Sequence, residues 1–218
     1  MAQVFHPSIN TFAKASVVGV GLGVAFLIFA ATAVERSSFV TRVNEPVSQP
    51  VPFSHQHHVG GLAIDCRYCH SSVENSAFAG MPSVETCMTC HSQIWRDSPM
   101  LAPVRESFAT NRAIAWSRVH RIPDYAYFQH DIHVNKGVGC ETCHGRVDRM
   151  PLMWKANTLH MDWCLECHRE PERHLRPKEK VFEMGYQSPA RQETASTQLL
   201  KERNIDTQRI TDCVTCHR

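Results

Sequence analysis

Ten cysteines occur in five pairs, with two residues between the members of each pair. The pairs are Cys66/Cys69, Cys87/Cys90, Cys140/Cys143, Cys164/Cys167 and Cys213/Cys216. A histidine directly follows every pair, at His70, His91, His144, His168 and His217. Two thiols one helical turn apart are spaced to form thioethers with the vinyl groups of haem, and the adjacent histidine is placed to bind the iron. The sequence therefore predicts five haem c groups, held by ten cysteines and five proximal histidines.

Two other uses of paired cysteines compete with this interpretation. Cysteine pairs build zinc sites, and an even number of cysteines in an exported chain is typical of disulfides. Neither chemistry requires a histidine after all five pairs, whereas haem attachment does. Haem is therefore the favoured prediction.

The chain contains no amphipathic helix or alternating strand long enough to build an ordinary hydrophobic core. The haems themselves are expected to form the core. We therefore predict a multihaem cytochrome c fold, with short α-helices and irregular loops wrapped around five haems, negligible β-structure, and one N-terminal transmembrane helix.

The N-terminal region contains twenty consecutive uncharged residues, 15–34. As a helix they span ~30 Å, the thickness of a bilayer core. The alternative is a cleaved signal peptide, because Ala31-Thr32-Ala33 resembles a small-residue cleavage site. We expect residues 1–14 in the cytoplasm, a transmembrane helix over 15–35 and an extended, proline-containing tether over 36–52.

Haem c is attached outside the cytoplasmic membrane, so the haem domain is expected on the periplasmic side of a bacterial inner membrane. Lys14, on the inner flank of the apolar segment, agrees with the excess of positive charge in cytoplasmic segments. The prediction is a single-pass membrane protein.

An internal repeat organises the haem domain, residues 53–218. The pattern Phe-x-His-x-x-His-Val occurs at 53–59 and again at 128–134, and two attachment sites follow each copy. We predict one dihaem module over 53–94, a linker over 95–127, a second dihaem module over 128–170, and a C-terminal segment with the fifth haem over 171–218.

The histidines outside the attachment motifs decide whether the irons are open or closed, because a second protein ligand closes the iron and leaves electron transfer as its role. His55/His58 and His130/His133 are spaced three apart, so each pair lies on one side of a helical turn. These four are predicted distal iron ligands, and His120 is the best fifth candidate. A surface histidine cluster or a zinc site is the alternative for the two pairs.

Met161 is a further candidate ligand, three residues before Cys164. A thioether ligand would raise the potential of its haem, while the alternative is a methionine packed on a haem face. If Met161 binds an iron, one of the five distal histidines does not. With every iron closed, the chain is an electron carrier and not an enzyme.

The charge pattern argues against a nucleic-acid partner. The chain has 23 Lys and Arg against 21 Asp and Glu, for a formal net charge of +2. These charges are interspersed and form no basic face.

Several segments together resemble a known family, the membrane-anchored pentahaem cytochrome subunit of alternative complex III. They are Phe53–His70, Val119–Tyr125, Met161–Arg169 and the C-terminal Thr-Asp-Cys-Val-Thr-Cys-His-Arg. The resemblance covers nearly the whole chain. The Phe-x-His-x-x-His-Val element alone also resembles class III cytochromes and other membrane quinone reductase subunits.

The resemblance implies a relay subunit in a respiratory complex that oxidises membrane quinol and passes electrons to a periplasmic acceptor. It implies three kinds of partner: an iron-sulfur protein, multispanning quinone-binding subunits and a monohaem cytochrome c. The chain departs from the family at His160, where a small or hydroxyl residue is expected before Met161, and this leaves one haem ligand open.

Two other functions use the same features. A stand-alone quinol dehydrogenase cytochrome would feed a soluble reductase and would not copurify with multispanning or iron-sulfur subunits. A catalytic multihaem reductase needs an open haem or an altered attachment motif, whereas all five motifs here end in histidine.

Overall fold

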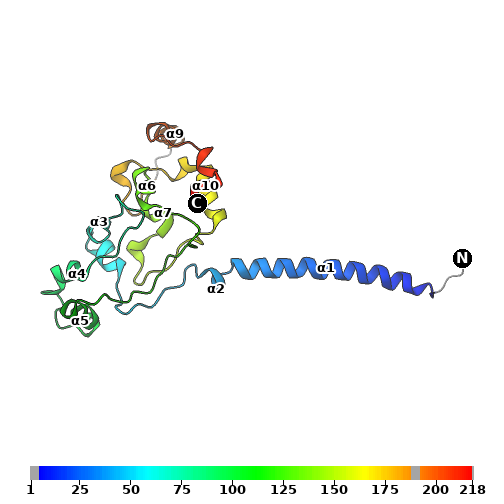
Figure 1. Ribbon diagram of the computed structural model, residues 1–218, viewed down its shortest axis with the longest axis horizontal. Helices are drawn as coiled ribbons and strands as arrows, with labels where there is room; N and C mark the ends of the chain where they lie inside the picture. Colours follow the sequence, from blue (N-terminus) through cyan, green and yellow to red (C-terminus); the bar gives the residue numbers. More distant parts are fainter. Residues whose placement is uncertain (1–4, 188–191, 218) are drawn as a thin grey trace. The chain divides into compact units, whose positions relative to one another are not determined.

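The computed structural model of the protein describes residues 5–187 and 192–217 (Figure 1). The chain forms two compact units, one ending at Arg42 and the other beginning at Val43. The expected C-terminal segment, 171–218, includes residues 188–191 and 218, which lie outside the described residues.

The first unit consists of a long helix, α1 (Ser8–Arg36), followed by the single turn α2 (Ser38–Thr41). Helix α1 has 29 residues and no buried side chain, and its length is about 43 Å. Two of its hydroxyl side chains bond to the helix backbone: Ser16 Oγ donates to the Ala13 carbonyl at 2.9 Å and Thr32 Oγ1 donates to the Ile28 carbonyl at 3.0 Å. By length and composition the helix is able to cross a membrane, and a signal sequence near an N-terminus has the same properties.

The second unit is built from short helices joined by loops. They are η1, a π-helix (Gln56–Gly61), α3 (Cys66–Cys69), α4 (Val84–His91), η2 (Pro99–Leu101), α5 (Ala102–Thr110), α6 (His130–Asn135), α7 (Cys140–His144), η3 (Val147–Arg149), α8 (Met161–Arg169), η4 (Pro171–His174), η5 (Lys178–Lys180), α9 (Gln192–Glu202), η6 (Arg209–Thr211) and α10 (Cys213–Cys216). Within the described ranges there is no strand, only isolated bridges that join Val43 to Lys155 and Val138 to Leu175. The predicted combination of short helices, irregular loops and negligible β-structure is confirmed.

Capping and glycine explain the bounds of two short attachment helices, α3 and α7. Asp65 precedes α3, and its carboxylate accepts the backbone N–H of Arg67 at 2.8 Å, which starts the helix. Helix α7 ends at His144 because Gly145 has φ +69°, a conformation that favours glycine. Helices α3 and α7 are therefore little more than one turn long, whereas α4 and α8 have 8 and 9 residues.

Protein side chains alone form only small hydrophobic clusters in this unit. One contains Val51, Leu101 and Val104, and the other contains Val73, Val134 and Val181. These clusters are small for a unit of this length. Such an interior fits a fold whose core is completed by prosthetic groups.

The segment expected as an extended tether is packed from Val43 onward. The backbone N–H of Asn44 donates to the Lys155 carbonyl at 2.8 Å, and that of Val47 donates to the Met153 carbonyl at 3.0 Å. Val51 is buried in the first cluster. Extended backbone needs hydrogen-bond partners, and this stretch finds them at Met153 and Lys155, within the predicted second module.

The two modules dock reciprocally. In the second module, the His130 and Asp131 N–H groups that start α6 donate to the carbonyls of Ala77 and Ser76, both at 3.2 Å. In the first module, η1 packs on η3, and the Gln56 N–H donates to the Met150 carbonyl at 3.0 Å. Each histidine helix thus rests on the loop that follows the first attachment site of the other module.

The C-terminal segment packs against residues of the predicted second module and those just before it. The Arg203 guanidinium donates to the carbonyls of Lys136, at 2.6 Å, and Arg176, at 2.7 Å. Farther along, the Tyr127 N–H donates to the Cys216 carbonyl at 2.8 Å, which holds the last attachment site beside the start of the second repeat.

Candidate functional site

Each of the five predicted proximal histidines has a hydrogen-bonding atom close to its Nδ1. In four of them this atom lies within hydrogen-bond distance of a backbone carbonyl: His70 with Gly80 (2.7 Å), His91 with Ile94 (3.0 Å), His168 with Ile210 (2.8 Å) and His217 with Tyr125 (3.0 Å). A carbonyl accepts only from N–H, so these rings carry their proton on Nδ1 and present Nε2 as the free donor atom. Such orientation of the ring is typical of histidines that bind metals. The fifth, His144, has His120 Nε2 at 3.3 Å from its Nδ1 instead.

Three of the predicted distal histidines are held in the same way. Nδ1 lies 2.8 Å from the Ser54 carbonyl in His58, 2.9 Å from the Ala77 carbonyl in His130, and 2.7 Å from the Gln129 carbonyl in His133. These rings also present Nε2. The buried Nδ1 of the fourth, His55, has no hydrogen-bond partner.

The structure brings predicted distal and proximal histidines together in pairs. Ring centroids are 6.2 Å apart for His58/His91, 6.3 Å for His130/His144 and 6.1 Å for His133/His168. Two imidazoles on opposite sides of one metal, each with a bond of about 2 Å, would have centroids about 6 Å apart. The spacing of these rings therefore fits one iron between each pair.

His55 lies near His70, the predicted proximal histidine of the first module that has not yet been paired with a distal histidine. Burial, followed by the nearby His70, lowers the pKa of His55 to about 4. Burial likewise lowers the pKa of His120 to about 4 and that of His144 to about 3. Neutral imidazole is the form that binds metal, and burial favours that form here.

The sequence repeat is also a repeat of ring geometry. Phe53 contacts His55 edge-on at 4.9 Å and stacks on His58 at 4.4 Å. Phe128 contacts His130 edge-on at 4.7 Å and stacks on His133 at 4.4 Å. Each phenylalanine therefore fixes the two histidines of its own module.

The fifth proximal histidine, His217, has no second histidine in ring contact among the residues that the structure describes. Its nearest aromatic neighbour is Tyr125, with ring centroids 5.8 Å apart. Met161 is the first residue of α8 and is 65% exposed. Helices α8 and α10, which carry Met161 and the fifth attachment site, both pack against η6.

Two other histidines differ in their surroundings. His57 is exposed, and its ring stacks on Trp95 with centroids 5.3 Å apart. His174, in a segment rich in charge, is half-buried and lines a cavity with Cys167. No sequence pattern predicted that His174 would lie near Cys167 of the fourth attachment site.

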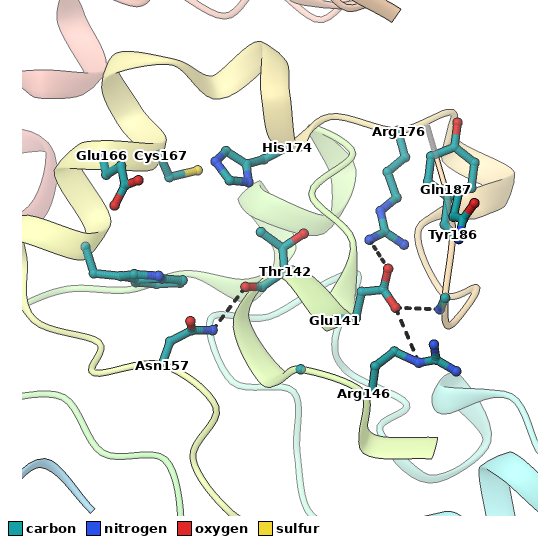
Figure 2. Close-up of a pocket in the computed structure, with 13 residues that line it drawn as sticks. Glu141, Thr142, Arg146, Asn157, Glu166, Cys167, His174, Arg176, Tyr186 and Gln187 are labelled. Atoms are coloured by element: carbon teal, nitrogen blue, oxygen red, sulfur yellow. Dashed lines mark hydrogen bonds and ion pairs between the residues drawn. The ribbon is translucent and has the colours of Figure 1, made fainter. Parts of the chain in front are cut away.

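That cavity has a volume of about 540 Å³ and lies between α7, α8 and the loop that follows η5 (Figure 2). On one side, Glu141 accepts a hydrogen bond from the Arg176 guanidinium at 2.6 Å and from the Gly185 N–H at 2.5 Å. On another, Asn157 donates to the Thr142 carbonyl at 3.2 Å. Glu141 and Thr142 of the third attachment motif and Cys167 of the fourth all line the cavity, which therefore lies between these two sites.

Contacts between the attachment motifs give their order in space. The Tyr68 and Thr89 hydroxyls, 2.9 Å apart, join the first and second sites. A hydrogen bond to Cys140 lowers the pKa of the Cys66 thiol and joins the first and third sites.

Cysteine thiols also show that the third, fourth and fifth attachment sites are neighbours. Burial, and then the nearby Cys167, raises the pKa of Cys143 to about 12, so the third and fourth sites adjoin. Burial, and then the nearby Cys216, raises the pKa of Cys164, so the fourth and fifth adjoin. The order in space is second, first, third, fourth, fifth.

The two ends of this row carry the exposed attachment thiols. Cys90 in the second site and Cys213 in the fifth are exposed, whereas the other eight cysteines are partly buried. In α4, Cys87 packs against the cluster around Leu101, while the Cys90 sulfur lies 3.8 Å from the Thr89 hydroxyl.

Cys90 and Cys213 therefore mark the two ends of the row of attachment motifs. A site at the end of the row has a neighbouring site on one side only, so part of its attachment motif lies at the protein surface. Thioether attachment requires an accessible thiol, so this exposure does not conflict with the predicted role of either cysteine.

The donor set fits haem c. None of the ten cysteine sulfurs forms a disulfide. Over residues 5–187 and 192–217, no group of three or more His, Cys, Asp or Glu side chains is arranged to hold a metal ion by protein ligands alone. Thiol pairs one turn apart, with paired imidazoles at the spacing of a shared metal, are the donors that haem c requires.

Known proteins agree with this chemistry. A family model for the class III cytochrome C family matches residues 32–108, and one for cytochrome c7 and related cytochrome c matches residues 126–218. The first match contains two attachment sites and the second contains three.

A curated relative is the menaquinone reductase, multiheme cytochrome c subunit, of Nitratidesulfovibrio vulgaris strain Hildenborough. It is 34% identical over 115 residues, which are 52% of this chain and 52% of the relative. The alignment thus spans about half of each protein. From its attachment motifs, its helical fold and these similarities, the chain is a multihaem cytochrome c with haem c as its cofactor.

Proposed function

We propose that this chain is a membrane-anchored electron-transfer subunit, which relays electrons through five haems c between a membrane quinone complex and a periplasmic partner. The observation that carries the proposal is the unbroken row of five attachment sites, four of which have a second histidine nearby. When bound, haem c supplies a reversible one-electron couple at each site. The protein's part is to fix the ligands and to keep neighbouring sites close.

The proposed ligand set has a distal residue for every site. We assign His55 to the first site, His58 to the second, His130 to the third and His133 to the fourth, on the basis of the ring pairs and of the position of His55 beside His70. All five irons are then closed, which supports electron transfer over catalysis at a haem.

For the fifth site we assign Met161. The helices that carry Met161 and His217 share η6 as a neighbour, and Cys164, three residues after Met161, lies close to Cys216. His120, the alternative, lies against His144 instead. A methionine ligand would make the haem at this end of the row the one of highest potential.

Location at a membrane is supported by α1, whose most apolar 18 residues have a mean hydropathy of 2.4. We propose that α1 is an uncleaved anchor in a bacterial inner membrane, with the N-terminus in the cytoplasm and the haem domain in the periplasm. The attachment of haem c outside the cytoplasm requires this orientation for a single span.

The partners follow from resemblance. We propose a quinol-oxidising complex like alternative complex III, with an iron-sulfur protein, multispanning quinone-binding subunits and a monohaem cytochrome c. The name of the N. vulgaris relative favours a second candidate, in which the same relay carries electrons toward menaquinone. Both candidates need the same closed irons and the same anchor.

The test is purification from membranes in mild detergent, followed by subunit identification and assays in both directions. Copurification with multispanning and iron-sulfur subunits, together with quinol-dependent reduction of the haems, would support the first candidate. Quinone reduction driven by a reduced periplasmic cytochrome would favour the second. A chain that oxidises quinol with no other subunit would overturn both.

A further inference from the structure

The third attachment site differs from the other four in what holds its proximal histidine. Elsewhere a backbone carbonyl faces Nδ1, whereas the Nδ1 of His144 faces Nε2 of His120 at 3.3 Å. The two rings meet edge-on, with centroids 4.4 Å apart and an interplanar angle of 77°. A side-chain acceptor thus replaces the carbonyl at this one site.

The position of His130 shows which face of His144 remains for iron. The two rings are nearly parallel, with an interplanar angle of 8° and centroids 6.3 Å apart. The Nδ1 of His130 is already engaged by the Ala77 carbonyl at 2.9 Å, so its Nε2 is the available donor atom. His130 therefore fits across an iron from His144, while His120 lies on the opposite nitrogen of the same ring.

This arrangement decides which nitrogen atoms of His144 and His120 carry a proton. A ring that binds metal through Nε2 carries its proton on Nδ1, so His144 donates and His120 accepts. His120 must then carry its own proton on Nδ1.

We propose that His120 is a positioning residue of the third haem site: it accepts the Nδ1–H of His144, fixes the plane of that ring and raises its basicity, and does not bind iron. Imidazole nitrogen is a stronger acceptor than a backbone carbonyl. A more basic proximal ligand favours Fe(III), so the contact lowers the potential at this site. The inference rests on the proposed pairing of His144 with His130 but not on the direction of electron flow.

The test is an EPR-monitored redox titration of the full-length holoprotein with four His120 and control variants. His120→Phe and the smaller His120→Leu remove the acceptor, whereas His120→Gln keeps an oxygen that can accept. His57→Phe is the matched control, because it removes an exposed histidine and keeps a ring that can stack on Trp95.

We expect all five haems to stay low-spin in every one of these variants. One midpoint potential rises in His120→Phe and His120→Leu, by about 59 mV for a tenfold change in a one-electron equilibrium. It returns toward the wild-type value in His120→Gln and is unchanged in His57→Phe.

Two results would overturn the inference. A high-spin haem in His120→Phe or His120→Leu would show that His120 is an iron ligand, and potentials equal to wild type in both would show that it has no positioning role. His130→Ala tests the underlying pairing separately. One high-spin haem is expected there, and five low-spin haems would overturn the pairing itself.

Discussion

At the scale of single residues, the distal histidines of the second and fourth sites share one local device. His58 and His133 each have Nδ1 against the carbonyl four residues earlier, and each stacks on the phenylalanine of its own repeat. Both contacts lie within a few residues of sequence. This is why the Phe-x-His-x-x-His spacing was enough to predict these histidines as candidates.

Replacing His58 by Ala is expected to leave the His91 iron with a single protein ligand. One haem in five should become high-spin in the EPR spectrum and bind carbon monoxide when reduced. His57→Ala is the matched control, since His57 is adjacent in sequence and stacks on Trp95. Five low-spin haems in His58→Ala would refute the assignment of His58 as a ligand.

A second residue-scale prediction concerns the Glu141–Arg176 ion pair, which lines the cavity between α7 and α8. Its side chains are only 14% and 8% exposed, and the Arg176 guanidinium also donates to the Glu183 carbonyl at 3.0 Å. Arg176→Met removes the closer of the two arginine partners of this buried carboxylate and leaves Arg146 Nε at 3.9 Å from it. The loss should lower the free energy of unfolding by about 3 kcal/mol.

The control for Arg176→Met is Arg173→Met. Arg173 pairs with Glu170 but is 72% exposed, so its loss should cost less than about 1 kcal/mol. Urea unfolding of the holoprotein, followed by haem absorbance, measures both. Equal losses would mean that burial does not set the strength of the Glu141–Arg176 pair.

At the scale of elements, the sequence repeat predicted two modules, and the structure adds that each histidine helix rests on the other module. No local pattern encodes that exchange, because it depends on contacts between residues about ninety positions apart, such as Gln56 and Met150. It explains why the first and third attachment sites adjoin.

Gly60 gives a direct test of the docking of η1 on η3. A Cβ at this position would clash with the backbone carbonyl of Asp148, which lies in η3. Gly60→Ala should therefore destabilise the protein by about 1–3 kcal/mol. Gly61→Ala is the matched control, since the nearest atom to its Cβ is the Gln56 carbonyl oxygen at 3.8 Å. A Gly60→Ala protein as stable as Gly61→Ala would contradict the docking.

Other elements were missed for physical reasons. Helix α5 lies in the predicted linker, although Pro103 in its first turn and Asn111 in the left-handed conformation after its end are ordinary helix boundaries. Its amphipathic pattern is short, so periodicity alone did not reveal it. The location of His120 had no sequence signal at all, because its partner His144 is 24 residues away and no regular element links the two.

At the scale of the whole molecule, the motifs predicted the number of haems, and contacts between motifs were needed for their order. Chain order would run from first to fifth, whereas the order in space begins with the second site. The proposed Met161 ligand then lies at one end of the row.

Membrane anchoring by α1 also belongs to this scale. Val20→Arg combined with Val24→Arg puts two charges in the middle of the apolar segment, at about 2.5–3.5 kcal/mol each. We expect the wild-type chain to resist carbonate extraction of membranes and the double variant to lose membrane insertion. Asn10→Arg, before the apolar segment, is the control and should remain anchored. A mature N-terminus that begins after Ala33 would instead identify a cleaved signal.

The central claim is that five closed irons make this chain a relay. The most direct measurement is the low-temperature EPR spectrum of the oxidised full-length holoprotein, combined with near-infrared magnetic circular dichroism to identify the ligands. We predict five low-spin haems, four with two histidines and one with histidine and methionine. A haem that is high-spin in the native protein would contradict the closed relay, because an open iron can bind substrate.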